Sequence, residues 1–139
     1  MKIEVCRLTS EWLEDAFELL ASDPNLCFKE WERARITEGL LGNDQIYLIA
    51  HRGKTLLGIL IGGVTLRAHI DHLIVAPGHR DRKIGSLLVA AAEEEFEARG
   101  VLRGRLTLTA ENAHGPVRRF YEARGYHVQE GEVGLERDF

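Results

Sequence analysis

The segment with the clearest capacity for chemistry joins a β-rich stretch to a helical one. Residues 79–86 read His-Arg-Asp-Arg-Lys-Ile-Gly-Ser. A loop between a strand and a helix gathers unpaired backbone N–H groups at the positive end of the helix dipole. Here basic side chains and a glycine are added, and such a loop suits a phosphate group. Composition alone supports a solvated, charged loop equally well.

A second polar group lies in the β-rich stretch before this loop, in the run His69-Ile70-Asp71-His72. Strand alternation places His69 and Asp71 on one face of the sheet and His72 on the other, unless a bulge intervenes. Polar residues near the centre of a sheet need a reason. They either take part in chemistry or form a satisfied structural Asp–His pair.

Strands and helices in alternation must position these residues, and the periodicity of apolar residues predicts where they lie. The predicted strands cover residues 2–8, 44–51, 55–66, 67 or 68 to 75, 105–109, 126–129 and 133–137. The predicted helices run from Thr9 or Ser10 to the breakers at 22–25, over 29–41 and 84–99, and from Pro116 to Gly125. This order predicts an α/β fold, a mixed sheet with helices on its faces.

The helix predicted over residues 84–99 connects two strands with a length that suits a right-handed crossover between parallel neighbours. Its glutamate run at 93–97 is expected to face solvent for the most part. The residues expected to face the sheet are Ile84, Leu87, Leu88, Ala91, Ala92 and Phe96.

Composition excludes several classes of protein. The 139 residues, 45% hydrophobic and 29% charged, fit a single domain over residues 1–139. A net charge of -4 argues against a general nucleic-acid binder. Cys6 and Cys27 are too few for a disulfide framework. The absence of an apolar leader and of a long apolar run predicts a cytoplasmic protein without a membrane segment.

Other enzyme classes fit the sequence poorly. Neither a GxxxxGK[ST] loop nor a GxGxxG motif after a first strand is present, which argues against a nucleotide-binding domain. His69 and His72 are three apart on a strand and would face opposite sides, so the sequence predicts no metal site.

Two motifs resemble those of the GNAT N-acetyltransferase superfamily. Residues 80–85, Arg-Asp-Arg-Lys-Ile-Gly, are similar to its Arg/Gln-x-x-Gly-x-Gly/Ala loop, and Val75-Ala76-Pro77 precedes them as the end of a strand. Residues 120–126, Phe-Tyr-Glu-Ala-Arg-Gly-Tyr, resemble its Phe/Leu-Tyr-x-x-x-Gly-Phe/Tyr segment. The resemblance implies a GNAT-like fold, with a central mixed sheet of six to seven strands, about four flanking helices and a splayed pair of parallel strands.

The resemblance implies acetyl-CoA as the cofactor, with its pyrophosphate on backbone amides of the loop and its pantetheine arm beside the preceding strand. The cofactor-binding residues that it implies are Leu73, Ile74, Val75, Arg80, Arg82, Lys83, Ile84, Gly85, Ser86, Asn112, His114 and Tyr121. Lys83 stands where the family has its first motif glycine. Its side chain could obstruct the approach of the cofactor to the backbone or, pointing outward, pair with a CoA phosphate.

An asparagine of the family lies seven residues before the motif tyrosine, and this offset from Tyr121 gives His114, whereas Asn112 is two residues earlier. Either Asn112 still reaches the cofactor from a longer loop, or His114 makes the contact. A turn before Pro116 is an equally good explanation of both residues.

The resemblance implies acetyl transfer to a primary amine of a small molecule or peptide by direct attack in a ternary complex. The amine must lose a proton, and Asp71 or His72, directly or through a water, is the candidate base. The phenol of Tyr121 is the candidate proton donor to the leaving thiolate, although its helical spacing with Val117 and Phe120 also suits packing. The alternative is an acyl-CoA-binding module with little or no turnover, and the family's dimers allow a homodimer without predicting one.

Overall fold

The structure is a computed structural model, and it describes residues 2–22, 29–40, 42, 44–64, 68–79, 83–101, 104–106 and 116–126. The chain forms two compact units, Met1–Arg105 and Leu106–Phe139. The predicted strands at 126–129 and 133–137 fall almost wholly outside the described residues, as do residues 107–109 of the strand before them.

The first unit is built on a sheet with strand order β1-β2-β3-β4-β5. The strands are β1 (Glu4–Arg7), β2 (Gln45–Arg52), β3 (Thr55–Val64), β4 (Ala68–Val75) and β5 (Gly104–Leu106), the last of which reaches the boundary of the unit. β1 to β4 pair antiparallel in sequence. The turn between β2 and β3 contains Gly53 at φ 60°, a conformation that glycine adopts freely, and this confirms the predicted hairpin.

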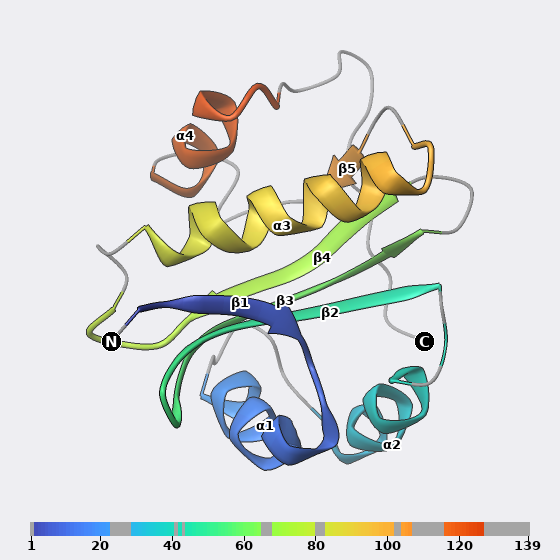
Figure 1. Cartoon of the computed structure of the whole chain (residues 1–139), viewed down its shortest axis with the longest axis vertical. Coiled ribbons are helices and arrows are strands. Elements are labelled where there is room, and N and C mark those ends of the chain that lie inside the picture. Colours follow the sequence, from blue (N-terminus) through green and yellow to red (C-terminus); the bar gives the residue numbers. More distant parts are fainter. Residues whose placement is uncertain are drawn as a thin grey trace. The chain divides into compact units, whose positions relative to one another are not determined.

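Helices lie on both faces of this sheet (Figure 1). The 3₁₀ turn η1 (Ser10–Trp12) leads into α1 (Leu13–Ala21), and α2 (Glu30–Gly39) follows on the same face. The crossover helix α3 (Ile84–Ala98) covers the opposite face. These bounds confirm the predicted helices to within a few residues.

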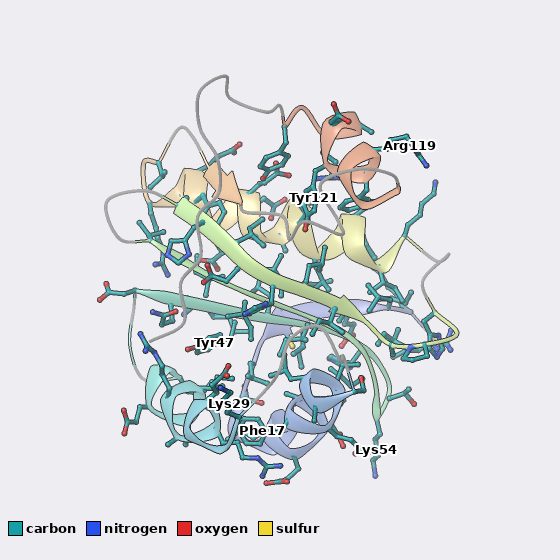
Figure 2. The ribbon with its side chains drawn as sticks, turned by 180° about the vertical axis from the view of Figure 1, so that it is seen from behind. Phe17, Lys29, Tyr47, Lys54, Arg119 and Tyr121 are labelled. Carbon is teal, nitrogen blue, oxygen red and sulfur yellow. The ribbon has the colours of Figure 1, made fainter. Side chains whose placement is uncertain are left out.

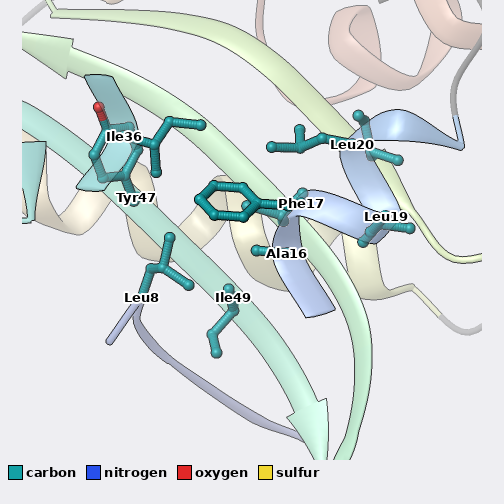
Figure 3. Close-up of a cluster of buried hydrophobic side chains, with 10 residues drawn as sticks. Leu8, Ala16, Phe17, Leu19, Leu20, Ile36, Tyr47 and Ile49 are labelled. Carbon is teal, nitrogen blue, oxygen red and sulfur yellow. The ribbon is translucent and has the colours of Figure 1, made fainter. Parts of the chain in front are cut away.

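A hydrophobic cluster joins α1 and α2 to one face of the sheet (Figure 3). Phe17 and Leu20 from α1 and Ile36 from α2 pack with sheet residues. The complete buried set is Leu8, Ala16, Phe17, Leu19, Leu20, Ile36, Tyr47, Ile49, Ile59 and Ile74. We call this face of the sheet, with Tyr47, Ile49, Ile59 and Ile74, the α1–α2 face.

On the other face, α3 buries Ile84, Leu88, Val89, Ala92 and Phe96. A glycine on β3 permits this close packing, because a Cβ at Gly58 would lie 3.1 Å from Ile84 Cγ2 and from Leu88 Cδ1. Leu87 is 43% exposed, so its prediction as a sheet-facing residue is wrong. Val89, which the predicted set did not contain, is buried, so the buried stripe is rotated around the helix toward Val89 and away from Leu87.

The second unit is described over α4 (Pro116–Ala123) and the turn that ends it. Pro116 is the first helical residue, as predicted. Gly125 has φ 93° and donates its backbone N–H to the carbonyl of Glu122, which confirms the predicted end of the helix.

Candidate active site

The predicted phosphate loop leads into the first turn of α3. Arg80 and Arg82 lie outside the described residues, whereas Lys83, Ile84, Gly85 and Ser86 are described. The helix begins at Ile84, so the N–H groups of Ile84, Gly85 and Ser86 have no intrahelical acceptor. They lie where the helix dipole favours an anion.

Lys83 adopts the left-handed conformation that glycine favours. Its φ of 59° and ψ of 21° make it the one non-glycine residue with positive φ in the part of the chain that the structure describes. This conformation costs an ordinary residue about 1–2 kcal/mol. The side chain is exposed, while the carbonyl accepts the N–H of Leu87 at 3.1 Å. Lys83 therefore keeps the backbone geometry of a glycine although it is a lysine.

The strand β4 contains the other predicted cofactor residues of this unit. Leu73 pairs with Leu60 and Val75 with Gly58 on β3, and both side chains are half-buried. Ile74 belongs to the hydrophobic cluster of the α1–α2 face. The side chain of Ile74 is thus part of the hydrophobic core, and only its backbone could contact the cofactor.

β4 contains a bulge at Asp71. His72 pairs with Ile61 and Ile70 pairs with Gly62, which leaves Asp71 as the extra residue. His69 pairs with Gly63. Because Ile61 and Gly63 are two residues apart on β3, their partners His72 and His69 face the same side of the sheet. The prediction that His69 and His72 lie on opposite faces is therefore wrong.

This shared side is the α1–α2 face, since Ile61 packs against its hydrophobic cluster. The bulge also removes the spacing argument that was used against a metal site. Within the described ranges, however, no group of three or more His, Cys, Asp or Glu side chains is placed to hold a metal ion.

Asp71 and His69 form a pair on this face. The Nδ1 atom of His69 lies 3.2 Å from both carboxylate oxygens of Asp71. The side chains are partly open to solvent, at 27% for His69 and 48% for Asp71. His72 is half-buried and makes no side-chain hydrogen bond to the residues described. The prediction from the sequence included an Asp–His pair only as a structural alternative. It did not include His69 among the catalytic candidates.

Sequence reasoning missed Tyr47, which lies on the same face of the sheet as this pair and in the electrostatic field of Asp71. Tyr47 on β2 is buried on the α1–α2 face, and its ring lies beside Ile36 (Figure 3) and on the same side of the sheet as Phe17 (Figure 2). Burial raises the pKa of its phenol, Arg35 lowers it and Asp71 raises it. The phenol thus lies in the electrostatic field of both a cation from α2 and the carboxylate of the bulge. A tyrosine in a strand gives no sign of such neighbours in the sequence.

Tyr121 is buried within α4 of the second unit. Its ring makes edge-to-face contacts with Phe120 at 5.0 Å and with Tyr126 at 5.7 Å. Burial, and to a lesser extent Tyr126, raises the pKa of its phenol to about 12. The hydroxyl therefore stays protonated at neutral pH and is able to donate a proton. Asn112 and His114 lie outside the described residues.

Two grooves among the described residues of the first unit are lined by other parts of the chain. One of about 420 Å³ runs between β1 and α3, and another of about 420 Å³ lies between α1, the β2–β3 turn and Pro77. Neither is lined by His69, Asp71 or His72. No described helix is both long and apolar enough to cross a membrane.

Comparison with known proteins gives a consistent result. The model of the acetyltransferase (GNAT) family matches residues 6–126. A spermidine N(1)-acetyltransferase of Thermoplasma acidophilum is 25% identical, over 94% of this chain and 91% of the relative. The solved PaiA N-acetyltransferase of the same organism, in complex with coenzyme A, has a TM-score of 0.72 at 24% identity, with 95% and 94% of the chains covered. The aminoglycoside N-acetyltransferase AAC(6')-Iy in complex with CoA has a TM-score of 0.83 at 15% identity, with 98% and 95% covered.

Proposed function

Because the chain belongs to the acetyltransferase (GNAT) family, we propose that it transfers the acetyl group of acetyl-CoA to a primary amine of a small molecule. The observation that carries the proposal is the first turn of α3. There Lys83 holds a glycine-like conformation at the position of the motif glycine, in front of three N–H groups that have no acceptor within the helix. A chain that keeps a strained conformation at a position where glycine is usual has a use for that backbone geometry.

The residues that would hold acetyl-CoA are those of this first turn. The N–H groups of Ile84, Gly85 and Ser86 would bind the pyrophosphate, and the exposed ammonium of Lys83 would add a point charge beside it. The chemistry that acetyl-CoA supplies is an acetyl group activated as a thioester.

The acceptor side is the α1–α2 face around the bulge of β4. The partly exposed carboxylate of Asp71 suits a cationic amine. A relative named for spermidine and a structural relative named for aminoglycosides both point to small amines with several positive charges. We therefore favour a small-molecule acceptor over a peptide.

The chain's own groups would handle the protons. Asp71, His69 and His72 are available to take the proton of the acceptor ammonium. Tyr121, which stays protonated, would supply a proton to the leaving thiolate. These proton transfers require neither a metal nor a redox group.

Calorimetric titration with acetyl-CoA and CoA tests the cofactor site. The wild type is expected to bind both with micromolar affinity. Replacing Gly85 with Val and Ser86 with Leu should abolish binding, because the larger side chains block the backbone N–H groups. Ala98→Val, at the exposed end of the same helix, is the control and should bind normally. No binding by the wild type at millimolar cofactor would contradict the proposal.

Turnover is tested by thiol release from acetyl-CoA in the presence of spermidine, propane-1,3-diamine and kanamycin. Release that depends on the added amine, with the acetylated product seen by mass spectrometry, is the expected result. Tight cofactor binding without release for any amine would instead support the acyl-CoA-binding module.

A further inference from the structure

We propose that His69, held by Asp71, is the residue that takes the proton from the acceptor amine. This inference rests on the proposed function and names the proton acceptor of that site. It starts from the bulge, which brings His69 to the α1–α2 face together with the extra residue Asp71. Without the bulge, His69 and His72 would face opposite sides of the sheet, and His69 would lie on the face away from α1 and α2.

The geometry of the pair determines which nitrogen of His69 is free. Nδ1 lies 3.2 Å from both oxygens of Asp71, so this nitrogen carries the hydrogen and donates it to the carboxylate. In the neutral ring the lone pair then resides on Nε2. A carboxylate that holds the tautomer in this way also stabilises the imidazolium once Nε2 is protonated.

Two glycines on β3 make room for this arrangement. A Cβ on Gly62 would clash with the backbone carbonyl of His69. A Cβ on Gly63 would lie 3.2 Å from both Cε1 and Nε2 of the His69 ring. The bare backbone at 62 and 63 lets β4 approach and leaves the Nε2 edge of the ring uncovered by a side chain from its pairing partner.

Acid–base chemistry favours the imidazole over the carboxylate as the acceptor. An alkyl amine with a pKa of about 10.4 is almost entirely protonated at neutral pH. A general base works best when its own pKa is near the operating pH, and an imidazole meets this condition in a way that a carboxylate does not. Asp71 is therefore a positioning residue in this scheme and His69 the catalytic one.

The steps balance as follows. The ammonium gives one proton to Nε2, and the freed nitrogen lone pair forms the C–N bond at the thioester carbonyl. The C–S bond breaks with its electron pair on sulfur. The phenol of Tyr121 protonates the thiolate to CoA-SH, and the second proton that the nitrogen loses restores the phenol. The imidazolium of His69 returns its proton to solvent, so the overall reaction releases one proton.

The test compares two amines that differ in basicity. The probes are propane-1,3-diamine and 2,2-difluoropropane-1,3-diamine, whose amino groups are far less basic. In His69→Gln, kcat/KM at pH 7 should fall about 100-fold for the first diamine, the low end of what a general base contributes, and only a few-fold for the second. In Asp71→Asn, kcat/KM should also fall more for propane-1,3-diamine than for its difluoro analogue. The difference between the two amines should be smaller than in His69→Gln, because the amide oxygen still accepts the hydrogen of Nδ1.

The controls separate this role from a structural one. Calorimetry should show unchanged binding of acetyl-CoA to His69→Gln. His51→Gln makes the same change on β2 and should leave both amines unaffected. An equal loss for both amines in His69→Gln, or a selective loss in His72→Gln alone, would overturn the inference. A wild type that acetylates none of spermidine, propane-1,3-diamine and kanamycin would overturn the proposed function itself, and the inference with it, before any variant is made.

Discussion

Lys83 shows how one side chain is tolerated at a position made for glycine. Its φ of 59° lies in the left-handed region, and its side chain is exposed. The strain is therefore local to the backbone, and it is borne at the N-cap of α3, where the site needs a defined geometry. The charge of the ammonium is the property that a glycine would lack.

Lys83→Gly is expected to raise the free energy of unfolding. Relief of the left-handed conformation should gain about 1–2 kcal/mol, while the greater freedom of glycine in the unfolded chain takes back about 0.4–1 kcal/mol. Urea denaturation measures the difference. CoA should bind more weakly and with less dependence on salt, because one cation is gone.

Lys29→Gly is the matched control for this prediction. Lys29 is also an exposed N-cap lysine, at the start of α2, but its φ is -114°. Glycine relieves no strain there and should lower stability slightly. Equal effects of the two substitutions would show that the left-handed conformation of Lys83 has no energetic consequence.

The residues of the site differ in how far the sequence reveals them. Asp71 and His72 are visible as polar residues in an apolar strand, and Tyr121 as part of a motif. The position of His69 depends on one extra residue in β4, and alternation with period two contains no mark of an insertion. The pair Gly62-Gly63 is the one available sign, since glycine within a strand often marks a bulge or a close approach.

At the scale of elements, the β3–β4 pair is the part that shapes the proposed acceptor side. Gly58 admits α3 on one face, whereas Gly62 and Gly63 admit His69 on β4. β3 therefore carries its glycines at the places where neighbours approach most closely. These approaches are packing constraints, and a substitution there changes the site without touching a polar residue.

Gly63→Ala should disturb both the sheet and the site. Its Cβ would lie 2.7 Å from the carbonyl oxygen of Asp44 and 3.2 Å from the ring of His69. Because the backbone at Asp44 cannot yield as a flexible side chain would, we expect a loss of about 1–3 kcal/mol in the free energy of unfolding. Displacement of the ring should also lower acetylation of propane-1,3-diamine more than that of its difluoro analogue.

Gly42→Ala provides the comparison, because its Cβ would meet only the carbonyl oxygen of Gly39, at an ordinary 3.7 Å. Chemical denaturation and the two-amine assay are measured on both variants. A Gly63→Ala protein as stable and as active as Gly42→Ala would mean that β3 and β4 are not held as closely as the structure has them.

At the scale of the whole chain, periodicity was enough to predict the order of elements and most of their bounds. Long patterns such as those of α3 and of the β2–β3 hairpin leave few alternatives. The α1 start was less accurate, because a 3₁₀ turn separates Thr9 from the first α-helical residue, Leu13. The two last predicted strands and the splayed strand pair stay predictions.

The alkaline limit of stability offers a measurement on the intact protein. The phenol of Tyr121 has a pKa of about 12 in the folded chain, against about 10 in an unfolded one. Between these values the unfolded chain releases a proton that the folded chain keeps, so stability falls as the pH rises from 10 to 12. The difference between these two pKa values corresponds to about 2–3 kcal/mol, and that stabilisation is fully present below pH 10.

Tyr121→Phe should remove this dependence. Its free energy of unfolding, measured in urea at pH 9, 10 and 11, should fall less steeply than that of the wild type. Tyr47→Phe should flatten the curve less, because Arg35 opposes the effect of burial on the Tyr47 pKa. Equal slopes for wild type and Tyr121→Phe would mean that the phenol ionises freely in the folded chain.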